Sequence, residues 1–178
     1  MNVTGLFATA LIGMTVLGGS PAAVVSAATM QSDKAGAPAK KAAAASVTAA
    51  GAGKTIEITG DDTMKYNVTT IAAKPGEEVH VKLTNKGTMP KMAAAHNFVL
   101  LKKGTDMTAF TTAAVMAGQT DYIPAKFKDQ VLASTKLAGP GETVEVTFKA
   151  PMVAGTYDFI CSFPGHATTM KGTLTVAK

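Results

Sequence analysis

The segment Cys161-Ser162-Phe163-Pro164-Gly165-His166-Ala167-Thr168-Thr169-Met170 decides how this chain is interpreted, and it holds the only cysteine in the sequence. A thiol, an imidazole and a thioether lie within one short stretch. Sulfur and imidazole ligands of this kind favour copper, and electron-transfer copper sites combine two histidines and a cysteine in a trigonal arrangement with a long axial methionine. The segment supplies only one histidine, so a second must come from elsewhere in the chain.

Two histidines outside this segment could complete such a site. Residues 78–83 alternate between polar and apolar side chains, and His80 lies on the polar face. The sequence therefore predicts that His80 points away from the core, because the outer face of an antiparallel sheet can face water. His96 instead begins the strand-prone run 96–101, where a side chain can face a site at one end of the fold. We expect His96 to be the second imidazole ligand.

From Lys54 onward the sequence alternates with period two in short runs, which are separated by turn-forming glycine, proline and asparagine. The runs predicted as strands are 54–59, 64–68, 78–83, 96–101, 131–137, 144–148, 156–161 and 172–176. Short strands at this spacing favour two packed antiparallel sheets. The fold class predicted is all-β, a Greek-key β-sandwich of seven to eight strands with one short helix insertion.

The insertion is predicted within residues 103–130, where the apolar spacing becomes helical. Its apolar stripe consists of Met107, Phe110, Ala114 and Ala117. Thr105 is predicted as the N-cap, Asp106 favours the positive end of the helix dipole, and Gly118 ends the pattern. Met107 and Met116 are expected to be packing residues of this helix rather than metal ligands.

The first 53 residues differ in composition from the rest. Residues 1–27 contain an apolar stretch followed by small residues suited to cleavage, which predicts a signal peptide. They lack the basic start that is usual in such a segment. An uncleaved membrane anchor is the alternative, because the span 3–28 is long enough to cross a bilayer. Residues 28–53 are rich in alanine, lysine and proline and predict a flexible linker. Residues 54–178 form the predicted copper-binding domain, and the expected location is the periplasm, possibly with a membrane tether.

Charge and cysteine content exclude some functions. The net charge is +5, and all the basic residues are lysines, whereas specific nucleic-acid contacts favour arginine. No nucleic-acid partner is predicted. One cysteine cannot form an internal disulfide, which leaves the thiol free to bind a metal.

Several motifs give residues 54–178 a resemblance to the azurins of the cupredoxin (type 1 blue-copper) family. They are the Cys161-x₄-His166-x₃-Met170 segment followed by Lys171-Gly172-Thr173-Leu174, the upstream pair His96-Asn97, and the loops Met89-Pro90-Lys91, Gly60-Asp61-Asp62 and Thr135-Lys136-Leu137. The resemblance implies a cupredoxin-like sandwich that binds one copper ion per domain. It implies His96, Cys161 and His166 as equatorial ligands, Met170 as the axial ligand and the main-chain carbonyl of Ala95 as a weak further contact.

The chain also departs from the azurin pattern at three places. Azurins usually have glycine where this chain has Ala95, whose Cβ restricts the backbone. They usually carry a disulfide near the N-terminus, for which this chain has no cysteines. Asn85 stands where azurins carry a buried histidine that titrates with redox state, so the resemblance implies a simpler pH response here.

The function implied is that of an electron carrier of the periplasm or cell envelope, and not an enzyme. It would shuttle single electrons between redox proteins, such as c-type cytochromes or copper/haem oxidoreductases. These partners would dock at an uncharged apolar patch around His166, which is predicted to consist of Met64, Met89, Pro90, Ala93, Ala94, Phe163, Pro164 and Ala167. A membrane contact is expected only if residues 1–27 remain uncleaved.

Parts of the sequence are also compatible with two other functions. The ten methionines suggest copper storage or delivery as the alternative, although they do not form the clusters expected of a Cu(I) trafficking protein. A Cys-His enzyme is less well supported, because a nucleophilic cysteine needs an open substrate cleft and the sequence has no obvious insertion to form one.

Overall fold

The computed structural model describes residues 53–178. The predicted signal peptide or anchor at 1–27 therefore lies outside the described residues, as does the linker at 28–53 apart from its last residue. Within residues 53–178, no helix has the length and apolar character needed to cross a membrane.

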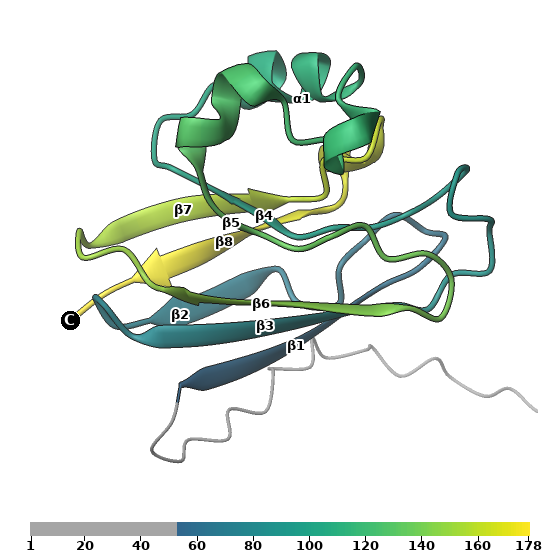
Figure 1. The fold of residues 1–178 in the computed structure, drawn as a ribbon. Helices are drawn as coiled ribbons and strands as arrows, with labels where there is room; N and C mark the ends of the chain where they lie inside the picture. Colours follow the sequence, from purple (N-terminus) through teal and green to yellow (C-terminus); the bar gives the residue numbers. More distant parts are fainter. Residues whose placement is uncertain (1–52) are drawn as a thin grey trace, which may run out of the picture. The chain divides into compact units, whose positions relative to one another are not determined.

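The described residues form two sheets, as the sequence predicted. The first sheet contains, in spatial order, β1 (Lys54–Gly60), β3 (Glu78–Asn85) and β6 (Thr143–Lys149). The second contains β2 (Thr70–Ala73), β8 (Lys171–Val176), β7 (Gly155–Ile160), β4 (Val99–Leu101) and β5 (Val131–Ser134). The pairs β1–β3 and β2–β8 are parallel and the others are antiparallel. The eight strands thus confirm the predicted all-β sandwich (Figure 1).

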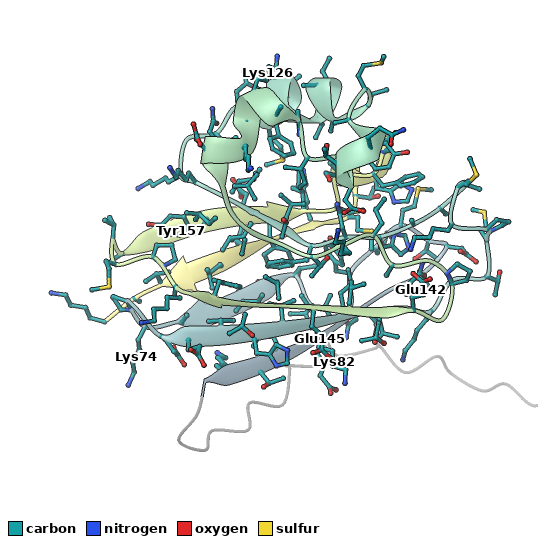
Figure 2. The ribbon with its side chains drawn as sticks, viewed as in Figure 1. Lys74, Lys82, Lys126, Glu142, Glu145 and Tyr157 are labelled. Atoms are coloured by element: carbon teal, nitrogen blue, oxygen red, sulfur yellow. The ribbon has the colours of Figure 1, made fainter. Side chains whose placement is uncertain are left out.

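The core follows from the alternation that predicted the strands. In β3, the apolar residues Val79, Val81 and Leu83 are completely buried, and the residues between them are partly exposed. Burying each such side chain contributes about 1.5–3 kcal/mol. His80 lies on the outer face as predicted, with its Nε2 3.1 Å from Glu145 Oε2. Figure 2 shows Glu145 and Lys82 on this outer side of the sheet.

The insertion between β4 and β5 contains one α-helix, α1 (Met107–Ala114), and two 3₁₀ turns, η1 (Gly118–Thr120) and η2 (Ala125–Gln130). In Figure 1 it lies beyond β4, β5 and β7, on the side away from β1 and β3. Phe110 and Phe127, with ring centroids 5.4 Å apart, form a second apolar cluster with residues of β4 and β7. This cluster covers the outer face of the larger sheet.

The insertion corrects two details of the prediction. The N-cap is Asp106, which accepts a hydrogen bond of 2.9 Å from the Ala109 amide. Thr105 instead donates its hydroxyl to the Lys102 carbonyl at 2.8 Å. Met107 packs against the second cluster, but Met116 is 89% exposed. The prediction that Met116 is a packing residue was wrong, because α1 ends at Ala114 before its apolar face would include this position.

Strand boundaries differ from the prediction at several places, and β5 ends at Ser134 where the prediction reached residue 137. Residues 64–68 contain only an isolated bridge between Tyr66 and Gly60, since Met64 has a left-handed φ of 55°. The neighbouring strand is β2, which pairs with β8 and was not predicted. His96 lies ahead of β4 in an isolated bridge with Ala138, and not at the first residue of the strand.

The tight packing around Gly172 in β8 gives a test of the second sheet. A Cβ on Gly172 would overlap the Phe159 ring and lie 2.6 Å from the Thr69 carbonyl oxygen. We expect Gly172→Ala to lower the free energy of unfolding by about 1–3 kcal/mol, the usual cost of overpacking, as measured by denaturant unfolding. Gly118→Ala is the control, because its nearest neighbour is 3.7 Å away, and it should change stability by less than about 0.5 kcal/mol. Equal stability of both variants would contradict the packing described for β7 and β8.

Candidate metal centre

Three buried side chains with metal-binding atoms meet at one end of the sandwich. The donor atoms of His96, Cys161 and His166 lie within 4.8 Å of one another. Cys161 Sγ is 3.6 Å from His166 Nδ1, and the two imidazole rings have centroids 5.2 Å apart. Each of the three residues is at most 3% exposed. Donor atoms this close to one another could bind a single metal ion.

Strand pairing brings the first two of these residues together. β4 and β7 are antiparallel neighbours with Val99 opposite Ile160, so the residues that precede β4 lie beside those that follow β7. His96 precedes β4, and the main chains of His96 and Ala138 exchange hydrogen bonds of 3.0 and 2.8 Å. Cys161 directly follows β7. The strand pairing thereby brings together two residues that are 65 positions apart in the sequence.

The loop after Cys161 folds back on itself and brings in the remaining residues. Gly165 has a φ of 83°, which glycine adopts without strain, and it leads into the short turn η3 (His166–Thr168). The Met170 amide donates to the His166 carbonyl at 2.8 Å, and the Cys161 amide donates to the Met170 carbonyl at 2.9 Å. Met170 therefore returns to a position next to Cys161.

The His96 imidazole has a ring nitrogen that is free to bind a metal. His96 Nε2 lies 3.1 Å from the Asp61 carbonyl oxygen, which can only accept a hydrogen bond, so Nε2 carries the proton and Nδ1 has a free lone pair. Within residues 53–178, His96 Nδ1 is the only buried side-chain nitrogen or oxygen without a hydrogen-bond partner. Leaving a buried polar atom unpaired costs about 1–3 kcal/mol. A bound cation would satisfy this atom, so the residues present fit a metal.

Burial also sets the protonation of the three groups. It lowers the pKa of His166 to about 4, with a smaller contribution from His96, and it also lowers the pKa of His96. Burial raises the pKa of the Cys161 thiol to about 11, although hydrogen bonds from the Asn97 and Phe163 amides act in the opposite direction. Near neutral pH the metal-free site therefore holds two neutral imidazoles and a neutral thiol.

The two predicted axial residues border the same site. Met170 is fully buried, and a Cβ on Gly60 would overlap its terminal methyl group and lie 3.1 Å from His96 Cδ2. The Ala95 carbonyl oxygen is 3.8 Å from Cys161 Sγ. Ala95 does not have a positive φ, so its Cβ introduces no left-handed strain where azurins usually have glycine.

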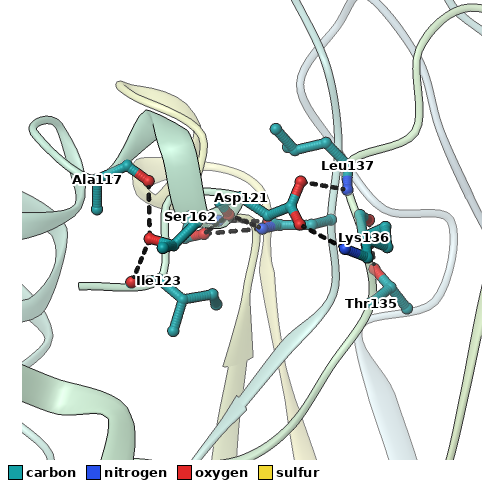
Figure 3. Close-up of polar contacts among 9 residues, drawn as sticks. Ala117, Asp121, Ile123, Thr135, Lys136, Leu137 and Ser162 are labelled. Carbon is teal, nitrogen blue, oxygen red and sulfur yellow. Dashed lines mark hydrogen bonds and ion pairs between the residues drawn. The ribbon is translucent and has the colours of Figure 1, made fainter. Parts of the chain in front are cut away.

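Asn97 connects the segments that carry His96 and Cys161. Its Oδ1 accepts from the Ser162 amide at 2.9 Å, and its Nδ2 donates to Ser162 Oγ at 2.9 Å. The same Nδ2 donates to the Asp121 carbonyl at 2.8 Å. Figure 3 shows Asp121 between Ser162 on one side and Leu137 on the other. Sequence reasoning did not identify Asp121 or Ser162, because neither residue type signals such a contact by itself.

Asn85 also has a defined structural role. It is buried, its Nδ2 donates to the Ala138 carbonyl at 3.0 Å, and its Oδ1 accepts from the Gly87 amide at 2.8 Å. These bonds hold the segment opposite His96 with a side chain that does not titrate.

The predicted apolar patch is only partly exposed. Ala94 and Phe163 are 2% and 8% exposed, so the expectation that they form part of a surface was wrong: both are covered by the packing of the loops that carry them. The members that reach solvent are Met64, Met89, Pro90, Ala93, Pro164 and Ala167. We call these six residues the apolar rim. Met92, which is 94% exposed, lies in the loop that carries Met89 and Pro90. It was not among the residues predicted for the patch.

Comparison with known proteins identifies relatives of this chain. The family model described as copper binding proteins, plastocyanin/azurin family, matches residues 52–177. Azurin of Alcaligenes faecalis is 39% identical over 123 residues, which cover 67% of this chain and 94% of that protein. Azurin of Pseudomonas aeruginosa is 37% identical over 125 residues, which cover 68% and 83%.

Solved structures also match this chain. Reduced auracyanin from Roseiflexus castenholzii matches with a TM-score of 0.62 and 36% identity, covering 72% of this chain and 100% of that one. Auracyanin A from Chloroflexus aurantiacus, described as a "blue" copper protein, also matches with a TM-score of 0.62 and 36% identity, covering 69% and 98%.

The protonation of the site gives a test of its donors. A thiol with a pKa of about 11 is protonated near neutral pH, whereas a metal binds the thiolate. The two imidazoles are already neutral. We therefore expect loading with Cu(II) to release about one proton, so that affinity rises about tenfold per pH unit from neutral pH towards the thiol pKa. Calorimetry in buffers of different ionisation enthalpy measures this release. Binding without proton release would contradict a role for the thiol.

Proposed function

Because this chain belongs to the plastocyanin/azurin family of copper binding proteins, we propose that residues 54–178 carry single electrons between redox proteins of the cell envelope. Homologues in this family are electron carriers and not enzymes. The observation that carries the proposal is the buried set of His96, Cys161 and His166 donors, with one lone pair of His96 left unpaired. We assign these three residues as equatorial copper ligands, Met170 as the axial ligand and the Ala95 carbonyl as a weak contact.

The function depends on how firmly these residues are held. Copper, when bound, supplies the one-electron couple. Cu(I) favours soft sites of low coordination number and Cu(II) favours tetragonal ones, so a site that serves both must resist rearrangement. In this chain the resistance comes from the strand ends that carry His96 and Cys161, and from the hydrogen bonds of Asn97 to Ser162. Such contacts orient ligands and tune the metal.

Burial of the donors supports electron transfer over copper storage or delivery. A delivery protein must exchange its metal with a partner through accessible ligands. The three side chains assigned here are at most 3% exposed. An electron needs only a short path through His166, whereas a metal ion would need this end of the sandwich to open.

Exported location and partner identity belong to the same proposal. The predicted signal peptide at 1–27 supports a periplasmic location. c-type cytochromes or copper/haem oxidoreductases are the proposed partners, docking at the apolar rim. Redox encounters typically bury less than about 1,200 Å², which suits a small uncharged surface. Exposed lysines close in sequence to rim residues, such as Lys65 and Lys86, would attract an acidic partner at low salt.

Replacement of the thiol tests the proposed function. Cys161→Ser keeps the size of the side chain but removes the sulfur ligand. We expect the intense visible charge-transfer band of the copper-loaded protein to disappear and copper affinity to fall, because the thiolate supplies both. The far-UV circular dichroism spectrum should remain that of the wild type. A variant that keeps the band would show that Cys161 is not a ligand.

A charge in the apolar rim tests the docking surface. Ala93 is exposed and Ala94 is buried, so Ala93→Asp introduces the charge without burying it. Two copies that meet through this face would bring two like charges together at about 1–4 kcal/mol, so electron self-exchange should slow about tenfold or more. The visible spectrum should not change.

Ala154→Asp is the matched control for this variant. Ala154 is exposed and directly precedes β7, at the opposite end of that strand from Cys161. It should leave self-exchange close to the wild-type rate. Equal slowing by both variants would mean that the effect is not specific to this face, and no slowing by either would show that electrons leave elsewhere.

A further inference from the structure

We infer that the residue pair Asp121-Tyr122 positions the three equatorial ligands, which makes the insertion between β4 and β5 a working part of the metal centre. This inference rests on the proposed copper site. It concerns a pair that no sequence motif identified, and it assigns the two residues as positioning residues and not as ligands.

The backbone of this pair is unusual. Asp121 has φ 53° and Tyr122 has φ 59°, and Met64 is the only other non-glycine residue with positive φ among residues 53–178. Aspartate tolerates this conformation, but it is unfavourable for a bulky side chain such as tyrosine. Backbone strain of this kind persists only where surrounding contacts hold it, and it concentrates at functional sites.

The main-chain carbonyl of Asp121 contacts the segments of two ligands. It accepts a hydrogen bond from Asn97 Nδ2 at 2.8 Å and a longer one from Ser162 Oγ at 3.5 Å. Asn97 follows His96, and Ser162 follows Cys161. Figure 3 shows Asp121 beside Ser162. One oxygen of the insertion therefore joins the hydrogen-bonded pair that holds these two ligand segments together.

The carboxylate of Asp121 reaches the His96 segment by a second route. Its Oδ1 accepts from the Leu137 amide at 3.3 Å, and the next residue, Ala138, exchanges two main-chain hydrogen bonds with His96. Lys136 Nζ lies 3.8 Å from Oδ2, but the Lys136 side chain is 86% exposed, so this ion pair contributes little. The useful contact of the carboxylate is the one with the main chain.

Tyr122 completes the set by supporting the third ligand. Its ring meets the Phe163 ring edge-on, with centroids 5.1 Å apart, and Phe163 packs against His166 at 4.7 Å. A hollow of about 230 Å³ lies between α1 and this loop, lined by Thr111, Thr112 and Val115 on the helix side. Tyr122 therefore provides a packed contact between the insertion and Phe163.

A set of variants distinguishes the contributions of the Asp121 backbone, the Asp121 carboxylate and the Tyr122 ring. Asp121→Ala removes the carboxylate and disfavours the left-handed backbone, Asp121→Gly removes the carboxylate alone, and Asp121→Asn keeps both the backbone preference and an acceptor. Tyr122→Ala removes the ring, and Tyr122→Phe keeps it. The measurements are copper affinity, the reduction potential, the visible band, and the imidazole NMR resonances of His96 and His166 in the metal-free protein.

We expect the two alanine variants to bind copper about 10- to 100-fold more weakly, as found for residues that orient ligands, and to shift the band and the potential. Asp121→Asn and Tyr122→Phe should restore wild-type values. If Asp121→Gly behaves like wild type, the carbonyl is the working group, and if it behaves like Asp121→Ala, the carboxylate is; both results support positioning. If an alanine variant fails to fold, the Asp121→Gly variant and the metal-free NMR spectra decide the question.

Asp106→Ala is the matched control. It removes a carboxylate from the same insertion, namely the N-cap of α1, and should lower stability without changing the band or the potential. Folded variants at Asp121 and Tyr122 with unchanged band, potential, affinity and imidazole resonances would overturn the inference. A wild-type protein without a charge-transfer band would instead overturn the proposed function, so the two failures can be distinguished.

Discussion

The hydrogen-bonded pairing of Asn97 with Ser162 is the interaction on which the metal centre depends. It joins two segments 65 residues apart through two bonds of 2.9 Å, and both residues are at most 2% exposed. Removing either partner would leave buried polar atoms without a hydrogen bond, which costs about 1–3 kcal/mol for each atom. The pairing therefore fixes the separation of His96 and Cys161 before any metal binds, and the hydrogen bonds that Asp121 accepts extend it to the insertion.

A site of this kind needs stabilisation from elsewhere, because it gathers polar groups where a sandwich would otherwise pack apolar ones. His96, His166, Asn97 and Asn85 are all buried at this end of the fold, and the sequence has no second cysteine to form a disulfide. The stabilisation comes from the apolar core between the sheets. A metal that binds only the folded state adds to it by mass action, roughly 4 kcal/mol at a thousandfold excess over Kd.

Much of this arrangement could be predicted because the informative residues are close in sequence. Cys161, His166 and Met170 lie in one segment, and strict alternation marks β1, β3, β6 and β7. Contacts set by tertiary packing could not be predicted. The segment around Tyr66 alternates like a strand, yet the left-handed Met64 restricts it to one bridge. Likewise, burial of Ala94, exposure of Met116 and the backbone of Asp121-Tyr122 follow from how loops pack and have no signature in residue type.

The position of His96 and Cys161 within the sandwich explains why this end of the fold is rigid. β7 lies between β8 and β4, and β4 lies between β7 and β5, so the two strands that lead to His96 and Cys161 have neighbours on both sides. Their inner residues Leu100 and Phe159 pack in the core between the sheets, and their outer residues Val99 and Ile160 pack under the insertion. Strands that are paired on both edges and buried on both faces open least readily. The insertion therefore contacts the candidate metal centre in two ways, since it covers the strands next to His96 and Cys161 and also contacts the loop that carries His166.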